Sequence, residues 1–391
     1  MKRFLHICIL LFLAESIAMA AVKVEISGRV VLGEKGGSAP ADYVMVYAKE
    51  YGVGTLSDED GNYNLSVITS ASSIHLEYSR IGYSVVDTTI VLTPPVTTVE
   101  PVVLQSQPLM LMAAYITKDG RDPAQVVLSN LWARCRQIRK NPFDFRADVE
   151  YRVATHEIPL VASALPKLAT GAVKLFAGFQ GYGPLVRYCL KNDDFQAHAK
   201  MFRQVKGGVS QDYNKTLVSS NKPLPSDVQR NVLDAFGMID IFNTMYGDSA
   251  VWGEKFAKKH KFTLTGTYEY GDKLVDVLSC TDRRGKTTAV LHIVEESWAI
   301  LKAQLITREG EVLRLEARDI GNGVYMPISL VVRPSVSVIH ADEIPGVIQS
   351  LQNNSSLPKK SRERLIKILR DHEGRDFNPY ISVSGNVRYK L

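Results

Sequence analysis

The clearest pattern along the chain is a strict alternation of apolar and charged residues between 143 and 153. Odd positions are apolar from Phe143 to Val153, and even positions are charged from Asp144 to Arg152. Successive side chains of a strand point to opposite faces, so this pattern is typical of an antiparallel strand with one face buried. We therefore predict a long, half-buried strand here.

A helix precedes this strand. Asp122 is a suitable N-cap, Pro123 suits the first helical position, and Gln125 completes a capping box. Asn141-Pro142 ends the segment. The apolar residues expected on one helix face are Val127, Leu128, Leu131, Cys135 and Ile138.

The C-terminal half alternates between short apolar stretches and turn residues such as Gly271-Asp272 and Gly321-Asn322-Gly323. This predicts an antiparallel meander with short loops, followed by a last strand at 380–390. The expected meander strands are 262–270, 274–281, 287–294, 298–308, 311–319 and 324–333. Two further helices are expected, at 226–245 with a Ser226…Gln229 capping box and at 359–371.

Residues 21–105 read as a small all-β module. Strands are expected at 22–31, 44–48, 74–78 and 85–92, and a strand, tight turn and strand at 54–65. Three landmarks resemble the carboxypeptidase-like regulatory domain: Ile26-Ser27-Gly28-Arg29-Val30, the segment 54–65, and Ile81-Gly82-Tyr83. The resemblance implies an all-β, transthyretin-like sandwich that acts in assembly or interaction. It implies no peptidase activity.

Residues 121–391 are predicted to form an α+β domain with a largely antiparallel sheet, joined to the β module by a connector at 106–120. The order of helix, long strand and meander resembles a lipoprotein-carrier (LolA-like) half-barrel. It is also similar to exported proteins that continue into an outer-membrane barrel. On that comparison, the strand at 380–390 would be a remnant of such a barrel.

Residues 1–20 are typical of a secretory signal peptide. Lys2-Arg3 is followed by an apolar run up to Leu13, and Ala18-Met19-Ala20 offers the small residues of a cleavage site. We expect an exported protein of the periplasm, outer membrane or cell surface, with no transmembrane span after removal of the signal. The cysteines that remain are Cys135, Cys189 and Cys280, and no two have CxxC spacing.

The composition supports a folded protein of more than one domain. The chain has 391 residues, of which 45% are hydrophobic and 23% charged. These values exclude global disorder and a collagen-like repeat. The formal net charge of +6 is too small over this length to indicate a nucleic-acid partner.

The candidate catalytic and metal-binding motifs each lack residues that their chemistry requires. His156-Glu157 begins like a zinc-protease motif, but the second histidine is replaced by Leu160 and Pro159 would break the helix. Asp58, Asp60 and Asn62 have calcium-loop spacing, yet the required glycine and glutamate are absent from the later positions. We expect no cofactor, no metal and no enzymatic activity.

The most unusual stretch is 158–186, which mixes large apolar side chains with glycine and proline. One interpretation is a core helix plus a loop. The functional one is an apolar lining over a concave sheet that holds an acyl chain or another hydrophobic ligand. The candidate lining residues are Leu160, Val161, Leu165, Leu168, Phe176 and Phe179.

The helix expected at 359–371 is basic on one side and apolar on the other. A solvated amphipathic helix is the plain interpretation. The functional alternative is contact with a membrane surface of anionic lipid headgroups. The candidate contact residues are Lys359, Lys360, Arg362 and Lys367.

Together these patterns predict an exported, non-enzymatic binding or assembly protein of the bacterial cell envelope. Its expected partners are an outer-membrane protein, a lipid or a lipoprotein. Two alternatives stay open. One is a structural or adhesive surface component without a small ligand. The other is a hydrolase whose site is not visible in the sequence.

Overall fold

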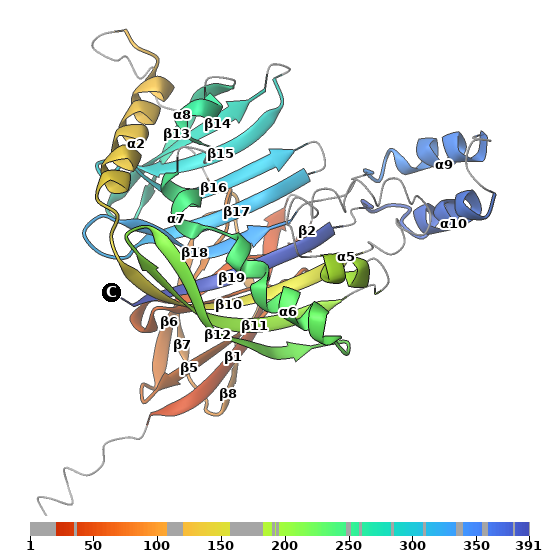
Figure 1. Cartoon of the computed structure of the whole chain (residues 1–391), viewed down its shortest axis with the longest axis horizontal. Helices are drawn as coiled ribbons and strands as arrows, with labels where there is room; N and C mark the ends of the chain where they lie inside the picture. Colours follow the sequence, from red (N-terminus) through yellow and green to blue (C-terminus); the bar gives the residue numbers. More distant parts are fainter. Residues whose placement is uncertain are drawn as a thin grey trace, which may run out of the picture. The chain divides into compact units, whose positions relative to one another are not determined.

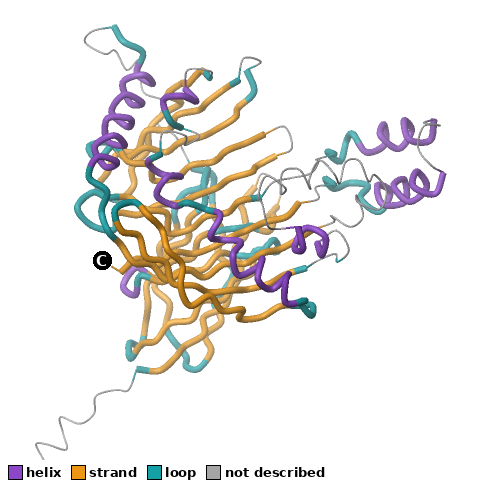
Figure 2. The backbone as a smooth tube through the Cα atoms, in the orientation of Figure 1, coloured by secondary structure: helices purple, strands orange, loops and turns teal. Residues whose placement is uncertain are grey.

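The computed structural model forms two compact units, Met1–Gln107 and Pro108–Leu391. The predicted β module 21–105 falls within the first unit and the predicted domain 121–391 within the second. Strands are the most common element in both units (Figure 2). The residues that the structure describes are 21–34, 37–107, 120–156, 183–189, 192, 195–247, 252–257, 260–282, 285–307, 310–333, 339–353, 359–377 and 380–390. The expected signal peptide lies outside them.

The first unit contains two sheets that contribute to one hydrophobic core. One sheet is built around β1 (Val22–Glu34), which pairs with β2 (Gly37–Pro40), β5 (Asn62–Thr69), β8 (Val96–Thr98) and β9 (Val102–Leu104). The other has the order β4-β3-β6-β7, with bounds Val53–Leu56, Met45–Ala48, Ser73–Ser79 and Val86–Val91. A short 3₁₀ helix, η1 (Lys49–Tyr51), joins β3 to β4. The transthyretin-like form of the sandwich stays a prediction.

The strand, tight turn and strand expected at 54–65 are confirmed as β4, a turn and β5. β4 pairs with β3 while β5 pairs with β1, so the turn between them crosses from one sheet to the other. Asp58 shapes this turn, because its carboxylate accepts hydrogen bonds from the backbone N–H groups of Asp60 and Asn62. This is the side-chain-to-backbone bonding of an Asx turn. No group of side chains suited to a metal is found among the described residues.

Gly28 and Tyr63 explain two of the landmarks of the β module. The two residues are directly paired in the β1–β5 ladder. A Cβ atom on Gly28 would lie 2.6 Å from the Tyr63 hydroxyl, so the tyrosine ring occupies the space that the glycine leaves. The Tyr63 hydroxyl is also hydrogen-bonded to that of Tyr78 on the other sheet, at 2.7 Å. The hydrogen bond between Tyr63 and Tyr78 therefore connects the two sheets.

The second unit is built on one ten-stranded antiparallel sheet (Figure 1). Its order is β12-β11-β10-β19-β18-β17-β16-β15-β14-β13. The first group of strands is β10 (Phe145–His156), β11 (Gln196–Lys206) and β12 (Val209–Ser220). The second is β13 (Lys261–Tyr270), β14 (Lys273–Thr281), β15 (Thr287–Val294), β16 (Ala299–Thr307), β17 (Gly310–Asp319) and β18 (Tyr325–Val332). The predicted antiparallel meander is confirmed.

The last strand, β19 (Tyr380–Lys390), lies in the middle of this sheet. It pairs with β10 on one side and with β18 on the other. The interpretation of 380–390 as the remnant of a membrane barrel is therefore wrong. The strand instead joins the group β10–β12 to the meander β13–β18 within one sheet.

Helices cover one face of the sheet. α2 (Pro123–Lys140) begins as predicted, since the Asp122 carboxylate accepts a hydrogen bond from the N–H of Ala124 at 3.0 Å. The prediction of a single helix at 226–245 is wrong. The segment forms α6 (Ser226–Ala235), the 3₁₀ turn η2 (Phe236–Met238) and α7 (Ile241–Tyr246). The Ser226 cap is also wrong, because the N-cap residue is Pro225 and no side-chain bond is made there.

The remaining helices are α5 (Gly183–Cys189), α8 (Glu254–Ala257), α9 (Ile344–Asn353) and α10 (Lys359–Arg370). α10 matches the predicted basic helix within one residue. α9 and α10 pack on each other between β18 and β19, and their apolar side chains form a small core of their own. The larger core of the unit is formed by the sheet with α2, α5, α6 and α7.

Candidate functional site

An apolar row runs across nine strands of the sheet of the second unit. Residues that pair directly in a ladder point to the same face, so the register identifies the row. It consists of Leu278, Leu291, Ala303, Leu315, Leu330, Gly385, Tyr151, Ala199 and Leu217. All but Leu217 are buried. This row marks the face that the helices cover, because Gly385 lies against the ring of Phe236 in η2.

A polar row runs beside it on the opposite face, displaced by one residue in each strand. It starts at Val277 and then contains His292, Lys302, Glu316, Ser329, Asn386, Glu150, Lys200 and Thr216. The two rows show that apolar and polar residues alternate between the two faces at this level of the sheet. A one-residue slip of any strand would exchange the two faces, so the register is strongly fixed.

The polar row changes from exposed to buried along its length. The side chains of Glu150 and Lys200 are 48% and 54% exposed, whereas those of Lys302 and Glu316 are 3% and 2% exposed. The Lys302 ammonium lies 3.9 Å from the Glu316 carboxylate. Burial and the nearby Lys302 charge lower the pKa of His292 to about 3, so this histidine is neutral. Its Nδ1 is hydrogen-bonded to the hydroxyl of Tyr268 at 3.0 Å.

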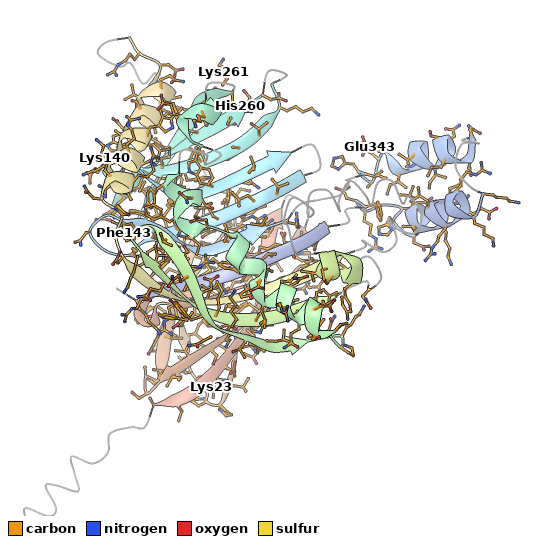
Figure 3. The ribbon with its side chains drawn as sticks, in the orientation of Figure 1. Lys23, Lys140, Phe143, His260, Lys261 and Glu343 are labelled. Atoms are coloured by element: carbon orange, nitrogen blue, oxygen red, sulfur yellow. The ribbon has the colours of Figure 1, made fainter. Side chains whose placement is uncertain are left out.

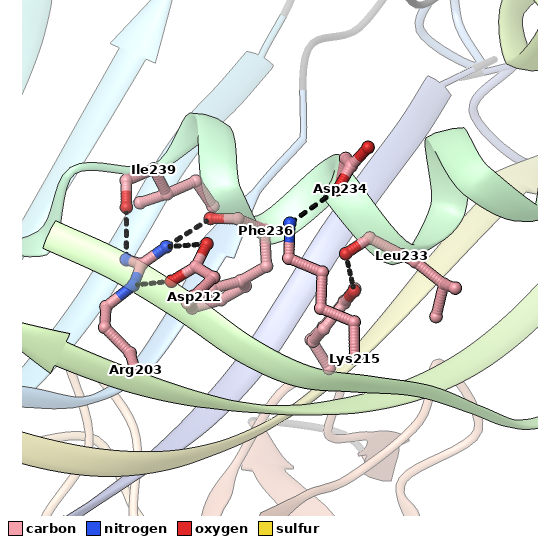
Figure 4. A network of polar contacts seen from close by, with 8 residues as sticks. Arg203, Asp212, Lys215, Leu233, Asp234, Phe236 and Ile239 are labelled. Carbon is pink, nitrogen blue, oxygen red and sulfur yellow. Dashed lines mark hydrogen bonds and ion pairs between the residues drawn. The ribbon is translucent and has the colours of Figure 1, made fainter.

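The break between α6 and α7 is explained by a polar network on β11 and β12 (Figure 4). The guanidinium of Arg203, which is 1% exposed, donates to the carbonyl oxygens of Phe236 and Ile239 at 3.3 and 2.7 Å. The Phe236 carbonyl also accepts from the N–H of Ile239 at 3.0 Å, and the last carbonyls of a helical segment need partners of this kind. The remaining N–H groups of the guanidinium bind the carboxylate of Asp212. The sheet thus determines where the helical layer bends.

Tyr151 holds the preceding turn of α6 in the same way. Its hydroxyl donates to the carbonyl oxygens of Val232 and Leu233, at 3.1 and 2.7 Å. Lys215 on β12 adds an ion pair with Asp234 at 2.5 Å. Three side chains of the sheet, Tyr151, Arg203 and Lys215, therefore fix the helical layer against the apolar row.

A small cleft lies between α2 and the segment after α7. It is lined by Trp132, Cys135, Arg136, Arg139, Gly247, Trp252, Gly253 and Glu254. Its volume is about 10 Å³, which is room for about one water molecule. The polar groups around it are engaged in the protein, since the indole N–H groups of Trp132 and Trp252 donate to backbone carbonyls. We assign the cleft no ligand.

The predicted apolar lining residues, Leu160 to Phe179, lie outside the described residues. The end of the apolar stretch is described, because Gly183–Cys189 forms α5. Leu185 is buried in the core, and its N–H donates to the side-chain oxygen of Asn231 in α6 at 3.1 Å. This end of the stretch is a core helix. On the other side, β10 ends at His156.

The predicted surface residues lie on α10, but not all on the same side of it. Lys359, Lys360 and Lys367 are exposed, and the Lys359 ammonium lies 4.0 Å from the Glu363 carboxylate. Arg362 is half-buried, because it lies on the side of the helix that faces the hairpin core. Arg364 and Arg370 are also exposed, although they were not among the predicted contact residues. The helical period places Arg364 on the same side as Lys360 and Lys367.

The cysteines carry no visible chemistry. Cys135, Cys189 and Cys280 are all buried, and none of the three forms a disulfide. Burial raises the pKa of the Cys189 thiol to about 12, so it is not a thiolate at neutral pH.

Among the described residues, no helix is long and apolar enough to cross a membrane.

No protein-family model and no curated protein matches the chain. A LolA superfamily protein from Nitrosomonas europaea is a structural neighbour at 11% identity and a TM-score of 0.23, covering 68% of this chain and 91% of its own. A putative outer-membrane lipoprotein-sorting protein domain from Vibrio parahaemolyticus has 8% identity and a TM-score of 0.23, with coverages of 68% and 94%. A putative membrane-associated protein of unknown function from Bacteroides fragilis has 12% identity, a TM-score of 0.18, and coverages of 95% and 100%.

The first of these neighbours is a member of the LolA superfamily, which the sequence resembles. TM-scores this far below 0.5 nevertheless establish neither a shared fold nor a shared function. The second unit is therefore characterised by its own geometry: an open antiparallel sheet, apolar on one face, with helices anchored over that face.

Proposed function

We propose that the protein is a non-enzymatic binding protein of the cell envelope whose second unit holds a hydrophobic ligand, such as the acyl chain of a lipid or lipoprotein. The observation that carries the proposal is the apolar row on the helix-covered face of the sheet. Apolar surfaces enclosed between layers of secondary structure are the usual sites for such ligands. In the sequence, the apolar stretch 158–186 follows β10 and runs into α5.

Two features support this assignment over a simple packed domain. First, α6 and α7 are held to the sheet by the polar side chains of Tyr151, Arg203 and Lys215. Polar anchoring at defined points keeps a helical layer in position even where a ligand replaces part of the apolar packing. Second, the row contains small residues, Ala303 and Ala199, beside large ones. Small side chains leave depth for a ligand.

The test is binding of a fluorescent fatty acid to the full chain. The double variant Phe176→Ala/Phe179→Ala removes two predicted lining residues and should weaken binding without unfolding the protein. The control is Phe202→Ala, which replaces a phenylalanine on the polar face of β11. Equal affinity of the parent and the double variant would contradict the predicted lining. No binding by the parent would contradict the proposed function.

A second candidate function is assembly with another protein through strand β12. This edge strand has no pairing strand on its outer side among the described residues. It exposes Val209, Tyr213 and Val218, with exposed fractions of 65%, 43% and 47%. Long exposed edges with apolar side chains are the usual templates for an added strand. Val218→Lys should abolish such assembly, measured by light scattering, and should leave fatty-acid binding unchanged.

A further inference from the structure

We propose that the hairpin of α9 and α10 is a docking arm that binds an anionic lipid bilayer by charge alone. This goes beyond ligand binding by the sheet, because it assigns a separate surface and a separate partner. Three properties of the hairpin carry the inference: its own core, the placement of its cations, and the separation of its positive and negative charges.

The hairpin is a small folded body within the second unit. Its base is tied by an isolated bridge between Ile339 and Phe377 and by Asp376, whose carboxylate accepts a hydrogen bond from the N–H of Ala341 at 2.9 Å. Glu343 lies at the start of α9 (Figure 3) and accepts from the N–H of His340 at 3.2 Å. The core of the hairpin consists of Ile344, Ile348, Leu351, Leu365, Ile368, Leu369 and Phe377.

This core determines how α10 can meet a membrane. An amphipathic helix that lies in a bilayer inserts its apolar face among the acyl chains. Here Leu365, Ile368 and Leu369 are already buried against α9, so no apolar face is free for insertion. Contact with a bilayer must therefore be made by the charged side of α10, at the level of the headgroups.

The cations of α10 form one stripe on that charged side. Lys360, Arg364 and Lys367 are exposed and stand four and three residues apart, which places them on one face of the helix. Lys359 and Arg370 flank the stripe, and Glu363 is the single carboxylate within the helix. α9, beside it, carries no charged side chain between Ile344 and Asn353. The exposed side of α10 is therefore positive.

Carboxylates gather at the other end of the hairpin. Those exposed around its base are Asp342, Glu343, Asp371, Glu373 and Asp376, which outnumber the exposed cation Arg375 in the same segment. An anionic surface attracts the α10 stripe and repels this base, so the charge separation orients the arm as well as binding it. An extended anionic surface matches a flat stripe of cations, which is why we assign a bilayer rather than a compact anion.

The test is co-sedimentation of the full chain with vesicles of phosphatidylglycerol and phosphatidylcholine. The variant Lys360→Gln/Arg364→Gln/Lys367→Gln removes three cations from the stripe. Each basic residue near an anionic surface contributes about fivefold in affinity, so the loss should be on the order of 100-fold. The control variant Arg146→Gln/Arg152→Gln/Lys206→Gln removes the same charge from exposed positions of the sheet and should bind like the parent.

Two further measurements test the proposal: binding at high salt, and binding to duplex DNA in place of vesicles. Binding should disappear in about 1 M salt, where charges are screened beyond about 3 Å. Binding that persists there, equal binding of the stripe variant and the parent, or an equal loss in the control variant would each overturn the proposal. Tighter binding to duplex DNA than to anionic vesicles at the same salt would overturn the lipid assignment. A Lys360→Arg/Lys367→Arg variant should bind normally, since it preserves the charge.

Discussion

Arg203 and Asp212 form a bidentate ion pair between β11 and β12, with Nε to Oδ1 at 2.7 Å and Nη2 to Oδ2 at 3.1 Å. The arginine side chain is almost fully buried and the aspartate side chain is 12% exposed. Because the same guanidinium binds the carbonyls of Phe236 and Ile239, the pair connects the sheet to the break between α6 and α7. Figure 4 shows the four residues together.

Removing one partner of this pair should be costly. Asp212→Ala leaves a buried guanidinium without its carboxylate, and such changes cost about 3–5 kcal/mol of the free energy of unfolding. The double variant Arg203→Met/Asp212→Leu removes both charges and should cost less than the single variant. Chemical denaturation measures both. A single variant as stable as the parent would show that the pair does not hold the layers together.

Gly28→Ala should destabilise the first unit. The added Cβ would meet the ring and hydroxyl of Tyr63 at 2.6–2.9 Å, and overpacking of this kind costs about 1–3 kcal/mol. Gly346→Ala on α9 is the matched control, because a Cβ there meets no atom within 4 Å. The control should show no loss of stability. Calorimetry of the full chain should show a lower transition temperature for Gly28→Ala alone.

Gly385→Ala tests the central place of β19. A Cβ at this position would lie 2.5 Å from the ring of Phe236 and 3.1 Å from the Cβ of Tyr151. We expect a loss of about 1–3 kcal/mol in the free energy of unfolding. Phe236→Leu in the same chain should restore part of it, as seen in urea unfolding curves. No loss in the single variant would contradict the packing of β19 beneath η2.

Asp276 should make stability depend on pH in a direction opposite to that of most carboxylates. Burial and the nearby Glu295 carboxylate raise the pKa of Asp276 from 3.8 to about 7. The folded state therefore keeps a proton that the unfolded chain releases between about pH 4 and 7, so the contribution of this group to stability falls as the pH rises through that range.

Asp276→Asn should remove this effect. The stability of the variant relative to the parent should be greater at pH 8 than at pH 5, because only the parent ionises a buried carboxyl in that interval. Urea midpoints of both proteins at the two pH values measure the difference. The same difference at both pH values would show that Asp276 ionises normally in the folded protein.

The local patterns of this chain predict much of its secondary structure. The alternation at 143–153, the meander turns and the Asp122 cap all correspond to observed elements, because each depends on neighbouring residues only. β11 and α9 were missed. β11 does alternate, with Ala197, Ala199, Met201 and Val205 buried, but its fourth inward position is Arg203. A buried arginine hides the pattern unless its partner Asp212 is known.

The arrangement of the elements could not be predicted in the same way. Nothing local to 380–390 indicates that β19 lies between β10 and β18, since that pairing joins residues far apart in the chain. The break in 226–245 depends on Arg203, which is distant in sequence from Phe236. The candidate lining residues at 160–179 lie outside the described residues, so that part of the site stays a prediction.

The most direct test of the proposed function is native mass spectrometry of the full chain, purified without detergent from a bacterial envelope fraction. Binding of a hydrophobic ligand predicts a species heavier than the polypeptide by the mass of a fatty acid or lipid, which is lost on adding excess fatty acid of a different mass. A single species at the mass of the polypeptide, unchanged by added fatty acid, would contradict the proposal.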